Sequence, residues 1–342
     1  MNSLKYKVLF RCDAADITGI GTGHLYRCIT IAQTLKKKYN LKFKDIAFVV
    51  QSEKKYKKSI TILKKYKFKI VKITKSSLKI NSDQEANFLK KNPSNLLILD
   101  RLGKTNLNFY NKIKNSFYKK IIIDDISKYR KYFDLSLNPL NHNVQKFKNS
   151  FIGFDYLILP SVSLKKNHKR INKKNILIFF GGYDAKDFTL KILKILNLIP
   201  FRLNIFLHHS FKKKITRNLE KNNLKFFNTR GYVKALNLAN ISITAAGIGL
   251  FDSIYFNKKI ICTPQYKKQE INVTKKSIKK VINLIKINDK NYEKKFNNTF
   301  LRIYNYQKKD LIVNKLQKKL INKKKLDMTM KLIFKLYEKS QH

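Results

Sequence analysis

Short apolar runs alternate with longer lysine-rich stretches through the first half of the chain. Such short runs, several of them rich in β-branched residues, are typical of strands buried on both faces of a parallel sheet. The stretches between them, such as residues 25–39 and 59–66, carry apolar residues at helical spacing. Strands that alternate with helices predict a doubly wound α/β fold. The expected strands are residues 8–10, 46–50, 68–73, 96–99 and 121–123.

The same alternation starts again near Asn175, which predicts a second α/β domain. A chain of 342 residues is long enough for two domains of about 150 residues each. The expected strands of the second half are residues 176–180, 203–207, 224–227, 241–244 and 259–263. The expected organisation is a Rossmann-like domain at 1–160, a linker at 161–174, a second Rossmann-like domain at 175–285 and a basic helical extension at 286–342.

The extension carries apolar residues at amphipathic helical spacing over residues 311–337. Two interpretations fit this pattern. The helices can pack through their apolar face and leave the lysines in solvent, or a basic face can lie on an anionic membrane. Ordinary packing is the favoured interpretation. No run of about 18 uncharged apolar residues is present, so no membrane-spanning helix is predicted.

The charge is strongly positive, with 75 Lys and Arg against 21 Asp and Glu and a formal net charge of +54. Polycations gain affinity for nucleic acids by releasing phosphate counterions, so a nucleic-acid binder is one interpretation. The even spread of lysine, the lack of Trp and the lack of an RRM, KH or zinc-finger pattern favour lysine as a general surface residue. We expect no specific nucleic-acid partner, but a weak association with anionic membrane surfaces.

Cys12, Cys28 and Cys262 are scattered and lack the spacing of a metal site or a disulfide framework. An odd number of cysteines without a framework is typical of a reducing compartment. The first residues pass directly into a strand, without the apolar segment of a signal peptide. The sequence therefore predicts a cytoplasmic protein without a bound metal.

Three of the chain's 10 glycines, Gly19, Gly21 and Gly23, lie between the first strand and the first helix. Glycine allows a sharp turn and a close approach of the backbone to a ligand. The following helix presents free N–H groups and a positive dipole end, which suit an anion. The spacing matches neither the dinucleotide fingerprint nor the P-loop, so neither of these nucleotide sites is predicted.

His24 directly follows this glycine loop, at the expected start of the helix. The positive helix end disfavours an imidazolium, which leaves a neutral ring able to take a proton from water or a sugar hydroxyl. The competing interpretation is a histidine that only caps or packs. Because Arg11, Asp13 and Arg27 are close in sequence, the functional interpretation is favoured.

Two further strands end in glycine turns, at Gly181-Gly182 and around Gly247 and Gly249. Their N–H groups suit a diphosphate, and Asp252, expected in the first turn of the next helix, suits ribose hydroxyls. The competing interpretation is an ordinary strand-to-helix turn, which is the commoner case for either turn alone.

Acids also follow two expected strands of the first domain, as Asp100 and as the pair Asp124-Asp125. The carboxyl ends of strands are where open α/β sheets bind ligands. Turn and helix-cap roles are the alternative, and for Asp125 the two interpretations are evenly balanced.

The segments Arg11-Cys12-Asp13 and Ile-Gly-Thr-Gly-His-Leu-Tyr-Arg-Cys at residues 20–28 resemble a known signature. It is that of the UDP-2,4-diacetamido-2,4,6-trideoxy-β-L-altropyranose hydrolases of pseudaminic acid biosynthesis and of related spore-coat polysaccharide biosynthesis proteins. The resemblance covers about residues 5–280, and the segment around His24 is its most specific part. It continues at residues 98–100, 122–125, 137–138, 156–159, 181–184, 246–252 and 269–272.

This resemblance implies the glycosyltransferase-B fold, an α/β architecture of two Rossmann-like domains facing across a cleft. It also implies a UDP-linked sugar as substrate, UDP held mainly by the second domain, and hydrolysis without a metal or other cofactor. His24 would be the general base and Asp13 would assist in the sugar pocket. The residues implied in substrate binding are Arg11, Gly21, Gly23, Arg27, Asp100, Gly181, Gly182, Gly247, Gly249, Asp252, Gln269 and Asn272.

The sequence departs from this pattern at several sugar and nucleotide contacts. Arg101-Leu102 stands where an aromatic residue or histidine is usual two positions after the acid, and Asp252 stands where glutamate is common. Lys268-Gln269 replaces an Asn-Gln pair. Two alternatives therefore stay open: a glycosyltransferase of the same fold, and a non-catalytic basic binder of anionic membrane or nucleic acid.

Overall fold

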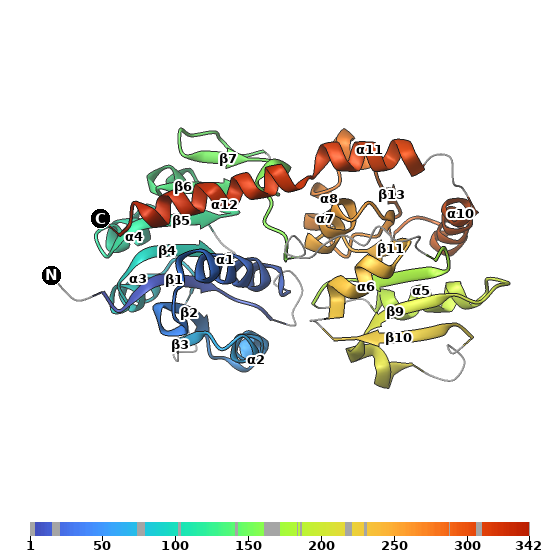
Figure 1. Cartoon of the computed structure of the whole chain (residues 1–342), viewed down its shortest axis with the longest axis horizontal. Coiled ribbons are helices and arrows are strands. Elements are labelled where there is room, and N and C mark those ends of the chain that lie inside the picture. Colours follow the sequence, from blue (N-terminus) through green and yellow to red (C-terminus); the bar gives the residue numbers. More distant parts are fainter. Residues whose placement is uncertain are drawn as a thin grey trace. The chain divides into compact units, whose positions relative to one another are not determined.

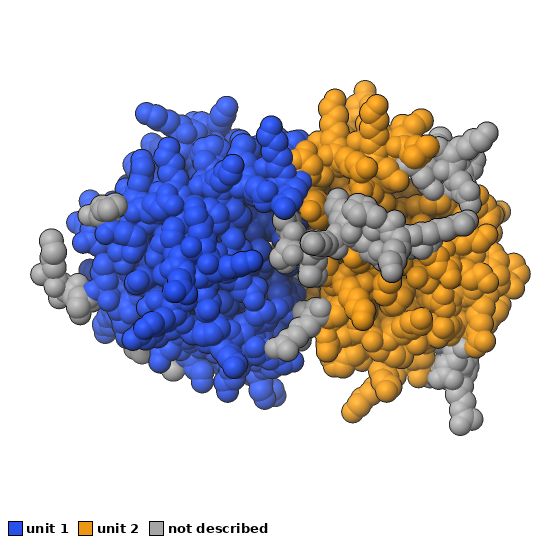
Figure 2. Space-filling view, viewed as in Figure 1, with its two compact units in different colours: residues 1–160, 323–342 blue, residues 161–322 orange. Residues whose placement is uncertain are grey.

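The computed structural model describes residues 4–15, 21–73, 79–101, 104–140, 143–160, 172–182, 184, 187–215, 221–228, 231–286, 288–305 and 310–341. The chain divides into two compact units (Figure 2). Unit 1 comprises Met1–Pro160 and Lys323–His342, and unit 2 comprises Ser161–Asn322.

Unit 1 contains a sheet whose described strands are all parallel, in the order β3-β2-β1-β4-β5-β6-β7 (Figure 1). The strands are β1 (Tyr6–Cys12), β2 (Ile46–Gln51), β3 (Lys69–Ile73), β4 (Ser94–Asp100), β5 (Phe117–Ile123), β6 (Leu135–Asn138) and β7 (Ser150–Ile152). The helices are α1 (Gly23–Tyr39), α2 (Lys57–Lys65), α3 (Asp83–Lys90), α4 (Leu107–Ile113) and α12 (Lys323–Glu338).

Both faces of this sheet are covered, which explains the continuous apolar runs in its strands. Val8 and Phe10 of β1 belong to the core beneath α1, and Leu9 belongs to the core beneath α3 and α4. The last helix, α12, places Ile333 and Tyr337 in the same core as α1. The expected basic extension at 286–342 is therefore divided between the two units, because the apolar stripe of α12 completes the core of unit 1.

Unit 2 repeats the arrangement, with parallel strands in the order β10-β9-β8-β11-β12-β13 among its described residues. The strands are β8 (Asn175–Phe179), β9 (Asn204–His208), β10 (Asn223–Phe227), β11 (Ile241–Thr244), β12 (Lys259–Cys262) and β13 (Asn283–Leu284). The helices are α5 (Phe188–Asn197), α6 (Tyr232–Leu238), α7 (Ile248–Tyr255), α8 (Lys267–Ile271), α9 (Lys276–Lys279), α10 (Tyr292–Asn305) and α11 (Asp310–Leu320).

The two sheets confirm the predicted α/β class with two Rossmann-like units. In each sheet the strand order reverses beside the first strand, between β1 and β4 in unit 1 and between β8 and β11 in unit 2. Such a reversal leaves a crevice at the carboxyl ends of the two strands, where α/β proteins bind their ligands. The topology therefore marks one ligand-binding edge in each unit.

Candidate functional site

The first glycine loop lies at the reversal point of unit 1. Cys12, at the end of β1, is paired with Asp100, at the end of β4. Gly21 has φ +57°, a conformation that favours glycine, and its carbonyl accepts a hydrogen bond from the Ala15 N–H at 3.0 Å. Gly19 lies outside the described residues. Helix α1 begins at Gly23, so His24 sits in its first turn, as predicted.

His24 is held by a buried carboxylate. Its Nδ1 lies 2.6 Å from Oδ1 of Asp100, whose side chain is fully buried, while 19% of the histidine side chain is exposed. An ionised carboxylate can only accept, so Nδ1 carries the proton in this pair. In the neutral ring, the lone pair is then on Nε2, which is the arrangement that a general base needs.

Arg27 holds the same carboxylate from the next turn of α1. Its Nε and Nη2 atoms donate to the two oxygens of Asp100, each at 2.7 Å, and its Nη1 donates to Asp124 at 2.7 Å. Burial alone would raise the pKa of Asp100, but the charge of Arg27, together with the hydrogen bonds that Arg27 and His24 donate, holds that pKa well below its usual range. Asp100 is therefore a fixed anion that orients the imidazole.

A second buried cluster surrounds Asp13. Arg11 donates from Nη1 to Asp13 at 2.5 Å and from Nε to Glu85 of α3 at 2.7 Å. Arg101 donates from Nη2 to the other oxygen of Glu85 at 3.1 Å. The second oxygen of Asp13 accepts from the Gln51 backbone N–H at 3.1 Å. Asp13 is thus fixed in place by a side chain and a backbone group.

In unit 1 the structure changes the expected roles of three residues. Arg11, Arg27 and Asp100, each expected to contact substrate, are at most 2% exposed. Their polar atoms bind one another, Asp13, Glu85 and Asp124, which leaves no accessible surface for a ligand. We assign them to positioning, Arg11 for Asp13 and the other two for His24.

Glu85, Arg101 and Asp124 were not among the expected site residues. Asp124 is a strand-end acid, so the sequence did carry a signal for it. Glu85 lies within a helix, and only the scarcity of acids in this chain could have singled it out. Arg101 is the second cationic partner of Glu85, and Leu102, where the sequence departs from the hydrolase pattern, lies outside the described residues.

In unit 2, both glycine turns lie at the reversal point of the sheet. Gly181 follows β8 with φ +85°, and the half-buried Gly182 comes next. Gly247 is the N-cap of α7. A Cβ on Gly249 would lie 3.2 Å from Thr244 Oγ1 and 3.3 Å from a Phe179 ring atom, so a side chain here would have to push its neighbours aside by a few tenths of an ångström. The two turns therefore bring exposed backbone and a helix N-terminus to one edge.

Gln269 and Asn272 hold these turns in place. Asn272 donates from Nδ2 to the carbonyl of Ala246 at 2.7 Å. Gln269 accepts from the backbone N–H of Gln265 at 2.9 Å, and the Gln265 side chain donates to the carbonyl of Phe180 at 2.8 Å. These amides tie the loop after β12 to the loops after β8 and β11.

Asp252 does not lie in the first turn of its helix, contrary to expectation. Helix α7 begins at Ile248, so Asp252 falls in the second turn, and it is 1% exposed. The Tyr232 hydroxyl donates to it at 3.4 Å, and burial together with this acid raises the pKa of Tyr232 well above its usual value. Asp252 packs inside unit 2 rather than presenting its carboxylate to a ribose.

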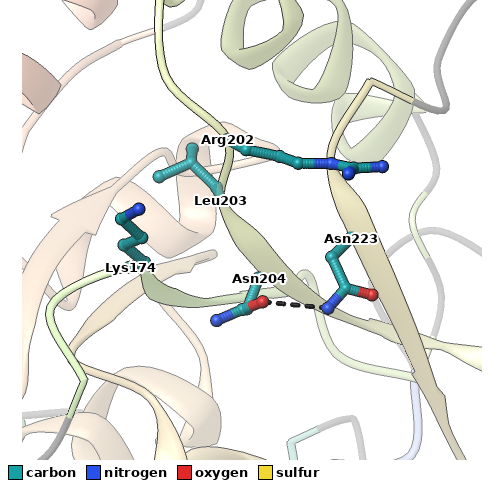
Figure 3. A pocket seen from close by; sticks show the side chains of 5 residues that line it. All are labelled: Lys174, Arg202, Leu203, Asn204 and Asn223. Carbon is teal, nitrogen blue, oxygen red and sulfur yellow. Dashed lines mark hydrogen bonds between the residues drawn. The ribbon is translucent and has the colours of Figure 1, made fainter.

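A cavity of about 360 Å³ lies at the amino ends of β8, β9 and β10, away from the glycine turns. Figure 3 shows its lining, in which the Asn223 amide donates to Asn204 at 3.0 Å. This edge is opposite to the one where α/β sheets bind ligands, so we leave it out of the site. Among the described residues, no group of three or more His, Cys, Asp or Glu side chains is placed to hold a metal ion.

The buried acids predict a specific acid sensitivity of unit 1. Burial alone would raise the pKa of Glu85, but Arg101 and Arg11 lower it to about 2. As the pH drops, the Glu85 carboxylate is therefore protonated in the unfolded chain before it is protonated in the folded chain. The free energy of unfolding falls by roughly 3 kcal/mol for this group between about pH 4.5 and pH 2. Glu85→Gln should be less stable than the wild type at neutral pH, by a margin that shrinks across this window.

Urea unfolding between pH 2 and 6 measures this difference. Glu293→Gln, at an exposed position of α10, is the matched control and should follow the wild type at every pH. A Glu85→Gln deficit that stays constant with pH would show that Glu85 is not ionised below its usual pKa.

Comparison with known sequences gives a distant relative and no family. No protein-family model matches the chain. An uncharacterised protein of Methanocaldococcus jannaschii is 26% identical over 279 residues, which cover 73% of this chain and 54% of the relative. The chain thus spans about half the length of the curated relative that it matches.

Solved structures resemble nearly the whole chain. MurG of Acinetobacter baumannii has a TM-score of 0.64 at 12% identity, covering 96% of this chain and 99% of that chain. UDP-glucose:anthocyanidin 3-O-glucosyltransferase in complex with UDP has a TM-score of 0.60 at 9% identity, covering 98% and 100%. The UDP-GlcNAc 2-epimerase from Neisseria meningitidis bound to UDP-GlcNAc has a TM-score of 0.56 at 13% identity, covering 97% and 100%.

The chain has the glycosyltransferase-B fold. At these identities the likeness establishes the fold alone, so the activity has to be argued from the residues. In this glycosyltransferase-B fold, the His24 pair and the paired glycine turns each lie where the strand order of one sheet reverses. None of the described helices combines the length and apolar composition that crossing a membrane requires.

Proposed function

We propose that the protein is a nucleotide-sugar hydrolase that releases UDP from a UDP-linked amino-deoxy sugar, in surface-glycan biosynthesis of the pseudaminic acid type. The observation that carries the proposal is the His24–Asp100 pair, 2.6 Å apart at the reversal point of unit 1. A fixed, buried carboxylate behind a partly exposed imidazole is the usual arrangement of a histidine base.

In the proposed reaction, water attacks the anomeric carbon of the sugar. The oxygen of the water forms the new bond, the bond from the anomeric carbon to the diphosphate oxygen breaks, and UDP leaves with that electron pair. Nε2 of His24 takes the proton lost by the water. Asp100 stabilises the imidazolium that forms, and Arg27 keeps the carboxylate in place.

The proposal assigns the diphosphate to the glycine turns of unit 2. Backbone N–H groups and the N-terminus of α7 can stabilise the charge that develops on the leaving group without the help of a cation. Asn272, which donates to Ala246, and Gln269, which acts through Gln265 on Phe180, would keep those N–H groups in position. Asp13, fixed by Arg11, would accept from a sugar hydroxyl.

The resemblance around His24 supports hydrolysis, and the structural neighbours support a nucleotide-sugar ligand. One neighbour is a glucosyltransferase in complex with UDP, and another is an epimerase bound to UDP-GlcNAc. A glycosyltransferase that passes the sugar to an acceptor is therefore the second candidate, favoured by the fold it shares with the glucosyltransferase.

Release of free UDP from a panel of UDP-sugars, assayed without any acceptor, tests the proposal. We expect release from UDP-linked diacetamido-trideoxy sugars and, in labelled water, incorporation of the oxygen label into the sugar. Strict dependence on an acceptor would replace hydrolysis by glycosyl transfer. A lack of UDP binding by calorimetry, with steeply salt-dependent DNA or lipid binding, would favour a non-catalytic basic binder.

A further inference from the structure

Helix α11 is labelled in Figure 1. It presents two large apolar side chains to solvent. Leu311 is 79% exposed and Ile312 is 64% exposed, although they are adjacent in one helix. The opposite side of the helix is anchored, because the buried Gln317 donates to the carbonyls of Lys258 at 2.9 Å and Val281 at 3.4 Å. The outward direction of the pair is therefore fixed by the packing of α11 on unit 2.

The same side of α11 is basic. At 100° per residue, Lys315, Lys318 and Lys319 fall on the side that carries Leu311 and Ile312, and all three are exposed. Lys323 and Lys324 come shortly after α11 ends at Leu320, and residues 311–326 contain no acid. Exposed apolar side chains beside a lysine cluster are the composition of a helix that lies on a membrane surface.

We propose that this face of α11, defined by Leu311, Ile312, Lys315, Lys318 and Lys319, docks on an anionic lipid membrane. The helix lies parallel to the surface, its two apolar side chains enter the boundary between headgroups and acyl chains, and its lysines contact anionic headgroups. The attachment is peripheral and does not depend on the proposed hydrolase activity.

Charge and size favour a membrane over other partners. Nucleic acid would attract the lysines but gain nothing from exposed Leu311 and Ile312. Two apolar residues are also too small an area for the core of a stable protein–protein interface. Residues 311–337 therefore do not share one explanation. The apolar stripe of α12 packs in the core of unit 1, as ordinary packing predicts, whereas α11 leaves apolar residues exposed.

Sedimentation with lipid vesicles tests the proposal, and the controls must remove the general attraction of a +54 chain to anions. L311S/I312S keeps the charge unchanged and should bind vesicles with about one-third phosphatidylglycerol roughly tenfold more weakly than the wild type. Leu198→Ser removes another exposed leucine, 81% exposed beyond the end of α5, and should bind as the wild type does.

The lysines are tested with two double variants that change the net charge by the same amount. K315E/K318E should weaken binding more than K276E/K279E, which makes the same change on the exposed face of α9. If L311S/I312S binds as tightly as the wild type, or if the two lysine variants lose affinity equally, the chain binds anionic lipid through its overall charge. The proposal that α11 docks on the membrane is then wrong. If the wild type binds purely zwitterionic vesicles as tightly as vesicles with phosphatidylglycerol, the lysines do not contact anionic headgroups.

The lack of tryptophan in the chain allows a direct measurement of insertion. Leu311→Trp introduces a single fluorophore, which should shift its emission to the blue on adding anionic vesicles. Leu198→Trp should show no shift. An unshifted Leu311→Trp in the presence of bound vesicles would exclude insertion of α11.

Discussion

Replacing His24 by alanine is expected to lower kcat by about 10²- to 10⁴-fold and leave the affinity for UDP nearly unchanged. The imidazole is the group placed to take the proton of the attacking water, and the Asp100 contact fixes its orientation. UDP affinity should persist because the proposal places the diphosphate at the glycine turns of unit 2. Steady-state UDP release and UDP titration calorimetry measure the two quantities separately.

The control is Tyr118→Ala, which removes a ring that is 51% exposed near the amino end of β5, at the edge of the unit 1 sheet opposite to His24. It should leave both kcat and UDP affinity unchanged. If His24→Ala retains wild-type turnover, His24 is not the base. If UDP affinity falls as steeply as kcat, the histidine acts on the nucleotide and the assignment of the diphosphate to unit 2 is wrong.

Replacing Asp100 by asparagine is expected to lower both activity and stability. The neutral amide introduced by Asp100→Asn cannot balance the buried guanidinium of Arg27, so unfolding should become easier by about 3 kcal/mol or more. The amide can also donate to Nδ1 of His24, which would move the ring proton to Nε2 and remove the base, so kcat should fall by about 10²-fold or more.

Two measurements separate these effects. Urea unfolding gives the stability loss, and ¹⁵N shifts of the His24 imidazole report which ring nitrogen carries the proton. Asp155→Asn, at a half-exposed acid paired with Lys325, should change stability by about 0.5 kcal/mol or less and leave kcat unchanged. An Asp100→Asn protein that folds, keeps its Nδ1 proton and turns over normally would contradict the positioning role.

The sequence predicted what depends on neighbouring residues. The strands of both sheets follow from apolar runs, because a strand covered on both faces must be apolar at nearly every position. The glycine turns and the first-turn position of His24 follow from local backbone preferences, since a positive φ at Gly21 or Gly181 favours glycine whatever surrounds it.

Contacts between distant residues could not be predicted from spacing. Glu85 binds Arg11 across 74 positions, and Asp100 binds His24 across 76. Nothing local distinguishes a buried acid with cationic partners from a solvated helix acid, so Glu85 gave no signal and Asp252 gave a misleading one. The same limit applies to Arg11, for which the resemblance implies a substrate contact but whose charge is neutralised within unit 1.

The alternation of strand and helix, the two-unit organisation and the histidine after a glycine loop were determined by the sequence itself. Only the tertiary structure decided which charged residues can reach a ligand and which hold another residue in place. It also decided that α12 completes the core of unit 1 while α11 leaves Leu311 and Ile312 exposed. The physical reason is that periodicity fixes which side of an element is apolar, whereas burial depends on what packs against that side.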